Sequence, residues 1–568
     1  MFGKFGVTIG REAIMKIMLK RTRDGSFEAV EVGVGTRIMD LREIERDRMP
    51  YPVFGAVANH RFVPMDTVLQ EGMQVELMDL RSAAALYSYQ DALSLMFLTA
   101  CAEELEGARV EIANSLNQGF YCEIRGLTPV PKETAKAVEA RMRRMAEEDL
   151  PIRRIYVSPQ EAGAILEREC NHPGFRLMEQ MNPDRKVCLS ELNGHHMLTC
   201  YGTLPSCGWV KMFELRSYRR GVLLRFPNME NPDCLPPYRD QEKLYQAFGE
   251  QTRWERLMKV SYVADLNEKV VGDSFRELVQ ISEALHEKKV AEIADRIKAE
   301  KKRIILIAGP SSSGKTTFAK RLQIQLRVNG LDALYLGTDD YFVERGETPL
   351  DENGEPDYEG LAAIDTELFC RNMNDLMAGK AVDLPRFNFL TGRKEFGHRI
   401  TAIRENQPII IEGIHGLNEE LTGGIAKEEQ FRIYISPLTQ LNLDCHNRVP
   451  TTDERLLRRL VRDYQFRGHD AATTIREWPK VRAGEDRNIF PYSGAADVVY
   501  NSYHIYEIAV LKKYAVPLLE AVGPEEPEYA MARQLLAVMD SFRMAGDDSC
   551  IVNNSIMREF IGGSVFLD

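Results

Sequence analysis

The sequence has no apolar run long enough to cross a membrane, no low-complexity tract and no closely spaced cysteine pair. A membrane span needs roughly 18 consecutive apolar residues, and the N-terminus also lacks the sustained apolar core of a signal peptide. The 10 cysteines are scattered without a C-x-x-C pair, which favours reduced thiols over a disulfide framework. These absences argue against membrane and secreted classes and predict a cytoplasmic protein.

Positive charge is scarce relative to negative charge. Lys and Arg number 73 against 85 Asp and Glu, which gives a net charge of −12. Because non-specific nucleic-acid binding needs a basic face, this balance counts against nucleic acid as a partner. It leaves open a local basic patch and therefore tRNA. With 44% hydrophobic residues the composition is that of a globular protein, and 568 residues predict roughly three to five domains.

The most informative stretch is GPSSSGKTT, which fits the phosphate-binding P-loop pattern G-x-x-x-x-G-K-[ST]. An apolar run of strand length, 304–308, precedes it, and apolar residues at helical spacing, 318–326, follow it. Strand, loop and helix in this order aim backbone N–H groups and a helix N-terminus at an anion. The sequence therefore predicts a nucleoside triphosphate site. Its residues are Gly309, Ser311, Ser312, Ser313, Gly314, Lys315, Thr316 and Thr317.

Apolar runs alternate with helical patterns from Arg303 onward, which predicts a parallel sheet covered by helices on both sides. Ligands gather at the carboxyl ends of such strands, where Asp339 follows the second run and Glu412 the third. We expect Lys315 to hold the β- and γ-phosphates, and Thr316 and Glu412 to bind Mg²⁺. Asp339 is expected to accept the proton of an attacking hydroxyl. The runs after the P-loop strand are 334–336, 409–411, 431–435 and 497–500.

The order of these motifs resembles the uridine kinase/phosphoribulokinase family from about residue 303 to 502. The resemblance implies a P-loop kinase that uses ATP and Mg²⁺. It also implies that Asp339 is the catalytic base, that Glu359 of the Tyr358-Glu359 pair binds ribose hydroxyls, and that Tyr341 belongs to the acceptor site. The segments that carry it are the P-loop, Asp339-Asp340-Tyr341-Phe342, GKAVDLP at 379–385, Glu412-Gly413 and RRLVRDYQFRGHD at 458–470.

The last of these segments belongs to an arginine stripe. Arg455, Arg458, Arg459 and Arg462 are related by steps of three or four and form one basic stripe along a predicted helix. Alone, such a stripe is usually solvated surface. Its position after the fourth strand and its resemblance to the family's lid predict contact with the phosphates instead. The predicted lid residues are Arg459, Arg462 and Arg467, and Arg459 is expected to reach the acceptor as well.

The acceptor side departs from the family. Uridine–cytidine kinases show Pro-x-Tyr-Asp followed by a His, whereas this chain reads PRFNFLTG, with Phe387 in place of the Tyr and Gly392 in place of the His. Phe387 still allows stacking, but a site without polar readout rejects close analogues weakly. The leading prediction is transfer of the ATP γ-phosphate to a nucleoside hydroxyl, the 5′-hydroxyl first. Two alternatives stay open: a kinase of a sugar phosphate or other small alcohol, and an ATP-dependent tRNA-binding regulator.

The front of the chain reads as short β segments and then as an α+β module. Residues 57–69 and 75–77 resemble a TGS domain, the ubiquitin-like module of threonyl-tRNA synthetases. Residues 112–124 with Gly119-Phe120-Tyr121, and the helix through 140–145, resemble the second additional domain of those synthetases. The resemblance implies a β-grasp-like fold followed by the α+β module. The predicted strands are 14–19, 27–32, 56–62 and 73–77, with a turn at Asp24-Gly25.

In the synthetases the second module carries an editing site with H-x-x-x-H on a helix and a later C-x-x-x-H. Here the helix reads Tyr87-Ser88-Tyr89-Gln90-Asp91, and the later element keeps only Cys200. Without the imidazoles that activate water, editing is not expected. His195, His196, Cys200 and Cys207 lack zinc-module spacing, so we expect loop histidines and buried thiols. The front half is predicted to be a binding or assembly module.

The prediction as a whole is a multidomain α/β protein. Its connector is expected to be helical, with a capping box at Ser274–Glu277 and an apolar stripe through Val290, Ile293 and Ile297. The tail is expected to pack on the kinase, and association of identical chains stays open. The predicted segments are 1–80 (TGS-like), 81–230 (second-additional-domain-like), 231–300 (helical connector), 301–525 (P-loop kinase) and 526–568 (C-terminal helical extension).

Overall fold

The structure is a computed structural model that describes residues 14–22, 25–116, 118–350, 354, 356–388 and 390–566. The chain forms two compact units. Unit 1 takes the described residues up to Asp240 together with Asn442–Arg448 and Val522–Val538. Unit 2 takes Gln241–Leu441, Val449–Ala521 and Met539–Asp568. The five predicted segments divide the chain differently and stay a prediction.

The first sheet of unit 1 has the order β2-β1-β5-β3-β4, with β1 and β5 parallel at its centre. Alternating side chains of β1, including Ile17 and Leu19, are buried beneath α1. The predicted strand 56–62 is two strands, because Asn59 and His60 have φ of 45° and 60° and turn the chain. The predicted Asp24-Gly25 turn involves Asp24, which lies outside the described residues. The elements are β1 (Ile14–Lys20), β2 (Glu28–Gly33), α1 (Ile38–Ile44), β3 (Gly55–Ala58), β4 (Arg61–Val63) and β5 (Gln74–Met78).

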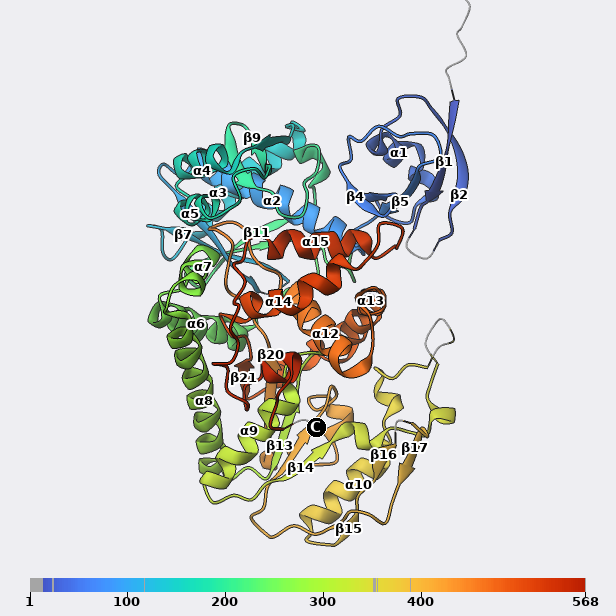
Figure 1. Cartoon of the computed structure of the whole chain (residues 1–568), viewed down its shortest axis with the longest axis vertical. Helices are drawn as coiled ribbons and strands as arrows, with labels where there is room; N and C mark the ends of the chain where they lie inside the picture. Colours follow the sequence, from blue (N-terminus) through green and yellow to red (C-terminus); the bar gives the residue numbers. More distant parts are fainter. Residues whose placement is uncertain are drawn as a thin grey trace, which may run out of the picture. The chain divides into compact units, whose positions relative to one another are not determined.

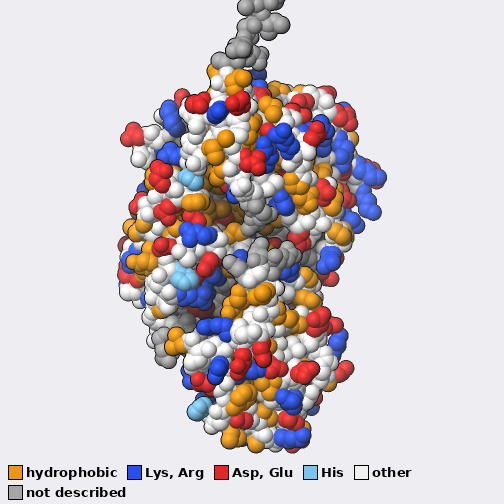
Figure 2. Space-filling model, turned by 90° about the vertical axis from the view of Figure 1, so that its right-hand side faces the viewer, with side chains coloured by type: hydrophobic (Ala, Val, Ile, Leu, Met, Phe, Trp, Pro, Cys, Tyr) orange, Lys and Arg blue, Asp and Glu red, His pale blue; other side chains and the backbone are white. Residues whose placement is uncertain are grey.

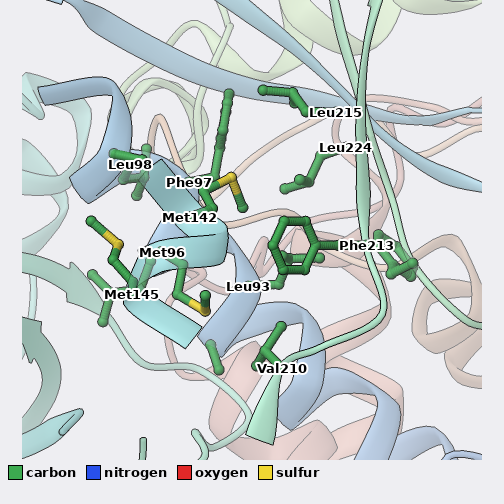
Figure 3. Close-up of a cluster of buried hydrophobic side chains, with 14 of the residues drawn as sticks. Leu93, Met96, Phe97, Leu98, Met142, Met145, Val210, Phe213, Leu215 and Leu224 are labelled. Atoms are coloured by element: carbon green, nitrogen blue, oxygen red, sulfur yellow. The ribbon is translucent and has the colours of Figure 1, made fainter. Parts of the chain in front are cut away.

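The rest of unit 1 is built around α2, which is apolar on all sides and therefore buried along most of its length. Figure 3 shows side chains of α2, among them Phe97, gathered with Met142 of α3 and Phe213 in one core. Two antiparallel sheets flank this core, with orders β10-β9-β8 and β11-β12-β7-β6. The elements are α2 (Ala83–Glu104), β6 (Arg109–Leu116), β7 (Gly119–Arg125), α3 (Lys132–Glu147), β8 (Arg153–Val157), α4 (Pro159–Arg168), α5 (His172–Glu179), β9 (Val187–Leu192), β10 (His195–Leu198), β11 (Glu214–Tyr218) and β12 (Gly221–Arg225).

Two short pieces from much later in the sequence complete unit 1. The loop Asn442–Arg448 joins β6 through the Ile112 N–H, which donates to the Cys445 carbonyl at 2.9 Å. Asn442 Nδ2 donates to the Ile112 carbonyl at 3.2 Å, so the pairing runs in both directions. The second piece, Val522–Val538, includes most of α15 (Tyr529–Met539). The expectation that the whole tail packs with the P-loop segment is therefore wrong for these residues.

Unit 2 begins with three helices, which lie in the segment predicted to be a helical connector. In α8 the stripe of Val290, Ile293 and Ile297 is buried against the P-loop strand and helix, as predicted. Figure 1 shows α8 beside α9. The predicted capping box is wrong, because the Ser274 side chain makes no cap hydrogen bond. The helices are α6 (Glu242–Met258), α7 (Val263–Val271) and α8 (Phe275–Ala299).

The main sheet of unit 2 is parallel throughout, with the order β14-β19-β13-β20-β21. The P-loop strand β13 lies at its centre, flanked by β19 and β20. All five predicted strands are present, and the α/β prediction is confirmed. The strands are β13 (Ile304–Ala308), β14 (Leu334–Gly337), β19 (Ile409–Glu412), β20 (Gln430–Ser436) and β21 (Val498–Asn501).

Helices and two small hairpin-like pairs surround this sheet. The pairs β15–β18 and β16–β17 are antiparallel and follow α10. The C-terminal residues Ile556 and Phe560 belong to the same core as β13 and α9, so this part of the tail does pack as expected. The remaining elements are α9 (Lys315–Val328), α10 (Thr366–Met377), β15 (Val382–Asp383), β16 (Arg386–Asn388), β17 (Arg393–Glu395), β18 (Ile400–Thr401), α11 (Glu419–Thr422), α12 (Thr451–Arg467), α13 (Ala471–Asn488), α14 (Glu507–Glu520) and α16 (Arg558–Ile561).

The distribution of charge on the surface and the apolar character of the helices agree with what the composition predicts. Lys and Arg lie interspersed with Asp and Glu on the coloured, described surface of the face in Figure 2, so that no basic field covers it. Within the described ranges, no helix combines the length and apolar character that a membrane span requires.

The core around α2 makes a local stability prediction. Phe97→Ala removes a fully buried ring from unit 1 and is expected to cost roughly 3–5 kcal/mol. Hydrogen–deuterium exchange of α2 peptides is therefore expected to speed up while β13 peptides change little. Leu257→Ala, at a side chain that is 66% exposed on α6, is the matched control. Equal exchange of α2 in the Phe97 variant and the parent protein would contradict this account of the core.

Candidate active site

The P-loop is shaped by two glycines that no other residue could replace. A Cβ on Gly309 would collide with the carbonyl oxygen of Ile435 on the neighbouring strand. Gly314 has φ of 81° and is the N-cap of α9, where a side chain would be strained. The loop therefore passes close to β20 and turns directly into the helix. This local geometry is the one that the motif predicts.

Lys315 and Thr316 begin α9 and point to different partners. Lys315 Nζ donates to the Pro310 carbonyl at 3.1 Å, within the loop itself. Thr316 Oγ1 donates to Glu412 Oε2 at 3.3 Å. The Tyr335 hydroxyl donates to the same carboxylate oxygen at 2.9 Å. Two hydroxyls from neighbouring elements thus orient Glu412 at the carboxyl end of β19.

Three acids surround Lys315, and we call Lys315, Asp339, Glu359 and Glu412 the Lys315 cluster. Burial raises the pKa of all three acids, and the nearby Lys315 charge acts in the opposite direction. The charge of Asp339 raises the pKa of Glu359 and Glu412 further. Asp339 is nevertheless exposed to solvent, so a substrate can reach it even though protein atoms crowd it. The structure therefore brings together four residues that are distant in the sequence.

The chemistry of this cluster fits a divalent cation. The Thr316 hydroxyl and the Glu412 carboxylate are hard oxygen ligands, which Mg²⁺ prefers. Burial and, to a lesser extent, the charge of Asp339 raise the pKa of Glu412, and a cation beside the two carboxylates would offset both effects. No group of three or more His, Cys, Asp or Glu side chains in the described ranges is arranged to hold a metal on its own. Phosphate oxygens and water would therefore have to complete the shell.

The arginine helix α12 is only partly the solvated stripe that its sequence resembles. Arg458 is fully buried, forms ion pairs with Glu507 at 2.6 Å and Glu454 at 2.8 Å, and donates to the Ser312 carbonyl at 3.2 Å. Burial opposes the charge of Arg458, but Glu507 and Glu454 outweigh it and raise its pKa. Arg455 is buried as well, pairs with Glu485 and donates to the Ser311 carbonyl at 3.0 Å.

The three predicted lid arginines lie on α12 and differ in their contacts and in their exposure to solvent. Arg459 Nη1 donates to Ser311 Oγ at 3.0 Å and so touches the P-loop. Arg462 and Arg467 are closer to solvent and both pair with Asp463, at 2.8 Å and 3.5 Å. The charge of Arg467 still lowers the pKa of Asp339, although burial outweighs it. Of these three lid arginines, Arg459 is the one with a hydrogen bond to the P-loop among the described residues, and it too pairs with Asp463, at 3.2 Å.

Glu359, the predicted acceptor-binding acid, is held against α13. A Cβ on Gly484 would lie 2.8 Å from the Glu359 Cβ, so a glycine is needed for this approach. Asn488 Nδ2 donates to the Glu359 carbonyl at 2.8 Å. The charge of Glu485 raises the pKa of Glu359 in addition to burial. Two acids therefore share this side of the site.

An aromatic group follows the acceptor-side loop. The ring of Phe342 packs edge-on against Phe387, with centroids 5.6 Å apart, and against Tyr358 at 6.2 Å. Gly392 has φ of 70° in the turn between β16 and β17, where a Cβ would strike Arg345. Tyr341 is placed differently from its prediction as an acceptor contact. It is 1% exposed in the core of unit 2, and its ring packs on Phe369.

The other sites weighed from the sequence lie in unit 1. The Asp91 carboxyl on α2 is buried, which raises its pKa to about 8, and it stands where the H-x-x-x-H pattern would place its second imidazole. The Cys200 thiol donates to Asn447 Oδ1 at 3.6 Å, a residue of the late loop. His195 and His196 both contact Glu169, at 3.4 Å and 3.0 Å. Both histidines lie in strand β10 and are partly exposed, so the expected placement in a loop is wrong. Of the two thiols, Cys207 is buried as expected and Cys200 is partly exposed.

Sequence reasoning missed three residues at the P-loop. The sequence marks Tyr335 only as part of a strand and Glu559 only as part of the C-terminal extension, and it gives Glu485 no role. Glu485 Oε1 accepts the Ser311 N–H at 2.9 Å, and Glu559 Oε2 accepts the Thr317 N–H at 3.3 Å. No local pattern marks them, because each reaches the loop through tertiary packing.

The part of the chain that carries the P-loop is similar to known kinases. Residues 304–509 match the model of the phosphoribulokinase / uridine kinase family. A uridine kinase of Staphylococcus aureus is 30% identical over 198 residues, which are 34% of this chain and 86% of that protein. A structure of a possible uridine kinase from Bacillus stearothermophilus is 20% identical, with a TM-score of 0.24 over 38% of this chain and 97% of that one. A putative fructose transport system kinase from Silicibacter is 19% identical, with a TM-score of 0.27 over 37% of this chain and 98% of that one. With such TM-scores, neither structure carries weight here.

The buried ion network of α12 makes a prediction about stability. Arg458→Met leaves Glu507 and Glu454 buried without their cation, and removing one partner of a buried pair costs roughly 3–5 kcal/mol. The thermal midpoint of unfolding is expected to fall clearly in this variant. Arg327→Gln changes an exposed arginine whose partner is 3.7 Å away, and it is expected to cost at most about 0.5 kcal/mol. Similar midpoints for the two variants would show that the network does not hold unit 2 together.

Proposed function

We propose, from the premise that this chain belongs to the phosphoribulokinase / uridine kinase family through residues 304–509, that it transfers the γ-phosphate of ATP to a hydroxyl of a nucleoside. The family implies a kinase that uses ATP with a divalent metal and a small-molecule acceptor. The finer assignment rests on one observation above all. The charge of Lys315 acts on the carboxyls of Asp339, Glu359 and Glu412, and the charge of Asp339 acts on those of Glu359 and Glu412.

In the proposed mechanism the P-loop N–H groups and Lys315 hold the phosphates. Asp339 accepts the proton of the acceptor hydroxyl, whose oxygen bonds to the γ-phosphorus as the bond to the ADP oxygen breaks. Arg459 lies beside Ser311 and would neutralise charge on the transferred group. Arg462 and Arg467 would join it by leaving Asp463. A divalent cation held by Thr316 and Glu412 would neutralise the phosphate oxygens.

The acceptor is proposed to be uncharged where it meets Glu359. The Glu359 and Glu485 carboxylates lie close enough to raise the pKa of Glu359. A second phosphate placed there would meet two acids, whereas ribose hydroxyls would donate hydrogen bonds to Glu359. Phe387 is 8% exposed and packs on Phe342, and its side chain has no hydrogen-bonding group. These features support a nucleoside over a sugar phosphate, and they support broad rather than uridine-specific base recognition.

We also propose that the front half is a TGS-like module followed by one that resembles the second additional domain of threonyl-tRNA synthetases. The five-stranded sheet with β1 and β5 paired in parallel supports the first assignment. For the second, Tyr87 and Asp91 lie on α2 where the editing pattern has imidazoles. Tyr87 and one carboxyl, Asp91, stand in place of the two imidazoles, so the pair of bases of the editing pattern is absent. This module is therefore proposed to serve binding or assembly and not hydrolysis.

The reaction is tested by a screen of nucleosides with ATP and Mg²⁺. At least one nucleoside is expected to be phosphorylated. Asp339→Asn is expected to lower kcat by roughly 10²–10⁴, because it removes the proton acceptor and leaves the shape. Product position is read by phosphorus NMR. Turnover of sugar phosphates alone would move the assignment to that acceptor class, and full activity of Asp339→Asn would remove Asp339 from the chemistry.

The same residue sets a pH dependence. Burial and Asp340 raise the pKa of Asp339 above its ordinary 3.8, against the opposing charges of Lys315 and Arg467. Because the base works only when deprotonated, kcat/KM is expected to fall as the pH drops through this raised value. The acid limb of the profile is therefore expected above pH 3.8. A limb at or below that value would assign the proton acceptor to another group.

Glu359 gives a test of the acceptor side alone. Glu359→Gln keeps the shape but loses the charge that would accept ribose hydroxyl bonds, so the acceptor KM is expected to rise about tenfold. The KM for ATP is expected to change little. Glu428→Gln, at an exposed acid, is the matched control. An unchanged acceptor KM, or an equal rise in both KM values, would contradict a specific role for Glu359 at the ribose.

A further inference from the structure

The C-terminal segment Ile551–Ile561 packs directly on the P-loop. A Cβ on Gly314 would lie 2.5 Å from Ile556 Cγ2, so the segment and the loop are in close contact. Phe560 is buried in the core of β13 and α9. The Arg458 guanidinium lies 4.9 Å from the centre of the Phe560 ring. The end of the chain is thus fixed beside the first turn of α9 by packing on both sides.

Glu559 uses this position to occupy donors of the phosphate site. Its Oε2 accepts hydrogen bonds from the Thr317 N–H at 3.3 Å and from Thr317 Oγ1 at 2.7 Å. Thr317 is fully buried, so its donors face the protein and not bulk water. It directly follows Thr316, the last residue of the P-loop motif, in the first turn of α9. These are donors of the kind that the loop and the helix N-terminus offer to nucleotide phosphates.

The charge of Glu559 acts on two charged groups near the P-loop. It contributes to the raised pKa of Glu412 and to that of Arg458. Glu559 is itself partly exposed, and among the ion pairs of the described residues none includes it. Among the described residues, Thr317 donates both hydrogen bonds that the Glu559 carboxylate accepts. The carboxylate is therefore a fixed anion at a place built for another anion.

We infer that Glu559 competes with nucleotide phosphate for the Thr317 donors and so sets the nucleotide affinity of the P-loop. A phosphate oxygen and the carboxylate cannot both accept from the same N–H and hydroxyl, and their like charges repel. Nucleotide binding then requires Glu559 to turn away or the segment to shift. This inference rests on the proposed function only in assuming that a nucleotide uses this loop.

The test is a titration of the full-length protein with ADP and Mg²⁺ in the absence of any acceptor. Glu559→Gln keeps the shape and removes the charge, so the Kd for ADP is expected to fall about tenfold. Asp547→Asn is the matched control, since it neutralises a tail acid that lies 3.9 Å from Arg276 and makes no contact with Thr317 among the described interactions. Its Kd is expected to equal that of the parent. An unchanged or higher Kd for Glu559→Gln would overturn the inference, and a lower melting temperature with unchanged Kd would mark Glu559 as a helix cap.

A second measurement needs no variant. Saturation of the parent protein with ADP is expected to speed hydrogen exchange in peptides that cover 551–561, because the segment loses its bond to Thr317. Exchange that stays the same or slows would overturn the competition. If ADP binds as described but no acceptor is phosphorylated, the proposed function fails and this inference stands. If an acceptor is phosphorylated but Glu559→Gln leaves the Kd unchanged, the reverse holds.

Discussion

The buried arginine pair of α12 is the constraint on which the candidate site depends. Arg455 and Arg458 donate hydrogen bonds to the carbonyl oxygens of Ser311 and Ser312. Their own charges are paired with Glu485 for Arg455 and with Glu454 and Glu507 for Arg458. Burying such charges is costly unless every partner is present, so the arrangement is all-or-none. With its carbonyls engaged on this side, the loop leaves its N–H groups for an anion. The arginines therefore orient the loop even though they need not touch a substrate.

The orientation of the loop also determines which charged groups surround its N–H groups. The N-terminus of α9 and Lys315 form a positive centre, and the acids at the ends of β14 and β19 gather around it. In the structure two further carboxylates, Glu485 and Glu559, accept from the N–H groups of the P-loop segment. Phosphates entering this centre would exchange one set of anions for another. The affinity for nucleotide is then a difference between two large electrostatic terms, which explains why a single distant acid can tune it.

Much of the fold could be predicted from sequence because its strands are short, apolar and locally marked. The P-loop, Asp339 and Glu412 followed from a motif and from strand ends, and the structure brings them together. Tyr341 was misplaced because a residue beside a catalytic acid can as easily point into the core as outward. The predicted capping box at Ser274 and the predicted single strand at 56–62 were wrong, because the backbone geometry at these positions differs from what the residue types favour. Glu485 and Glu559 were beyond reach, since only the packed chain brings residues 174 and 242 positions apart into contact.

The late pieces of unit 1 have a consequence for how the protein is made. Ile112 finds its partner in Cys445, and Val522–Val538 belongs to the same unit. During translation, the first 240 residues leave the ribosome long before these pieces exist. Unit 1 therefore stays incomplete while most of unit 2 is synthesised. It is completed only when the segments Asn442–Arg448 and Val522–Val538 have left the ribosome. The two units therefore cannot complete their folding one after the other during synthesis. Their folding is expected to finish as a single event near the end of synthesis.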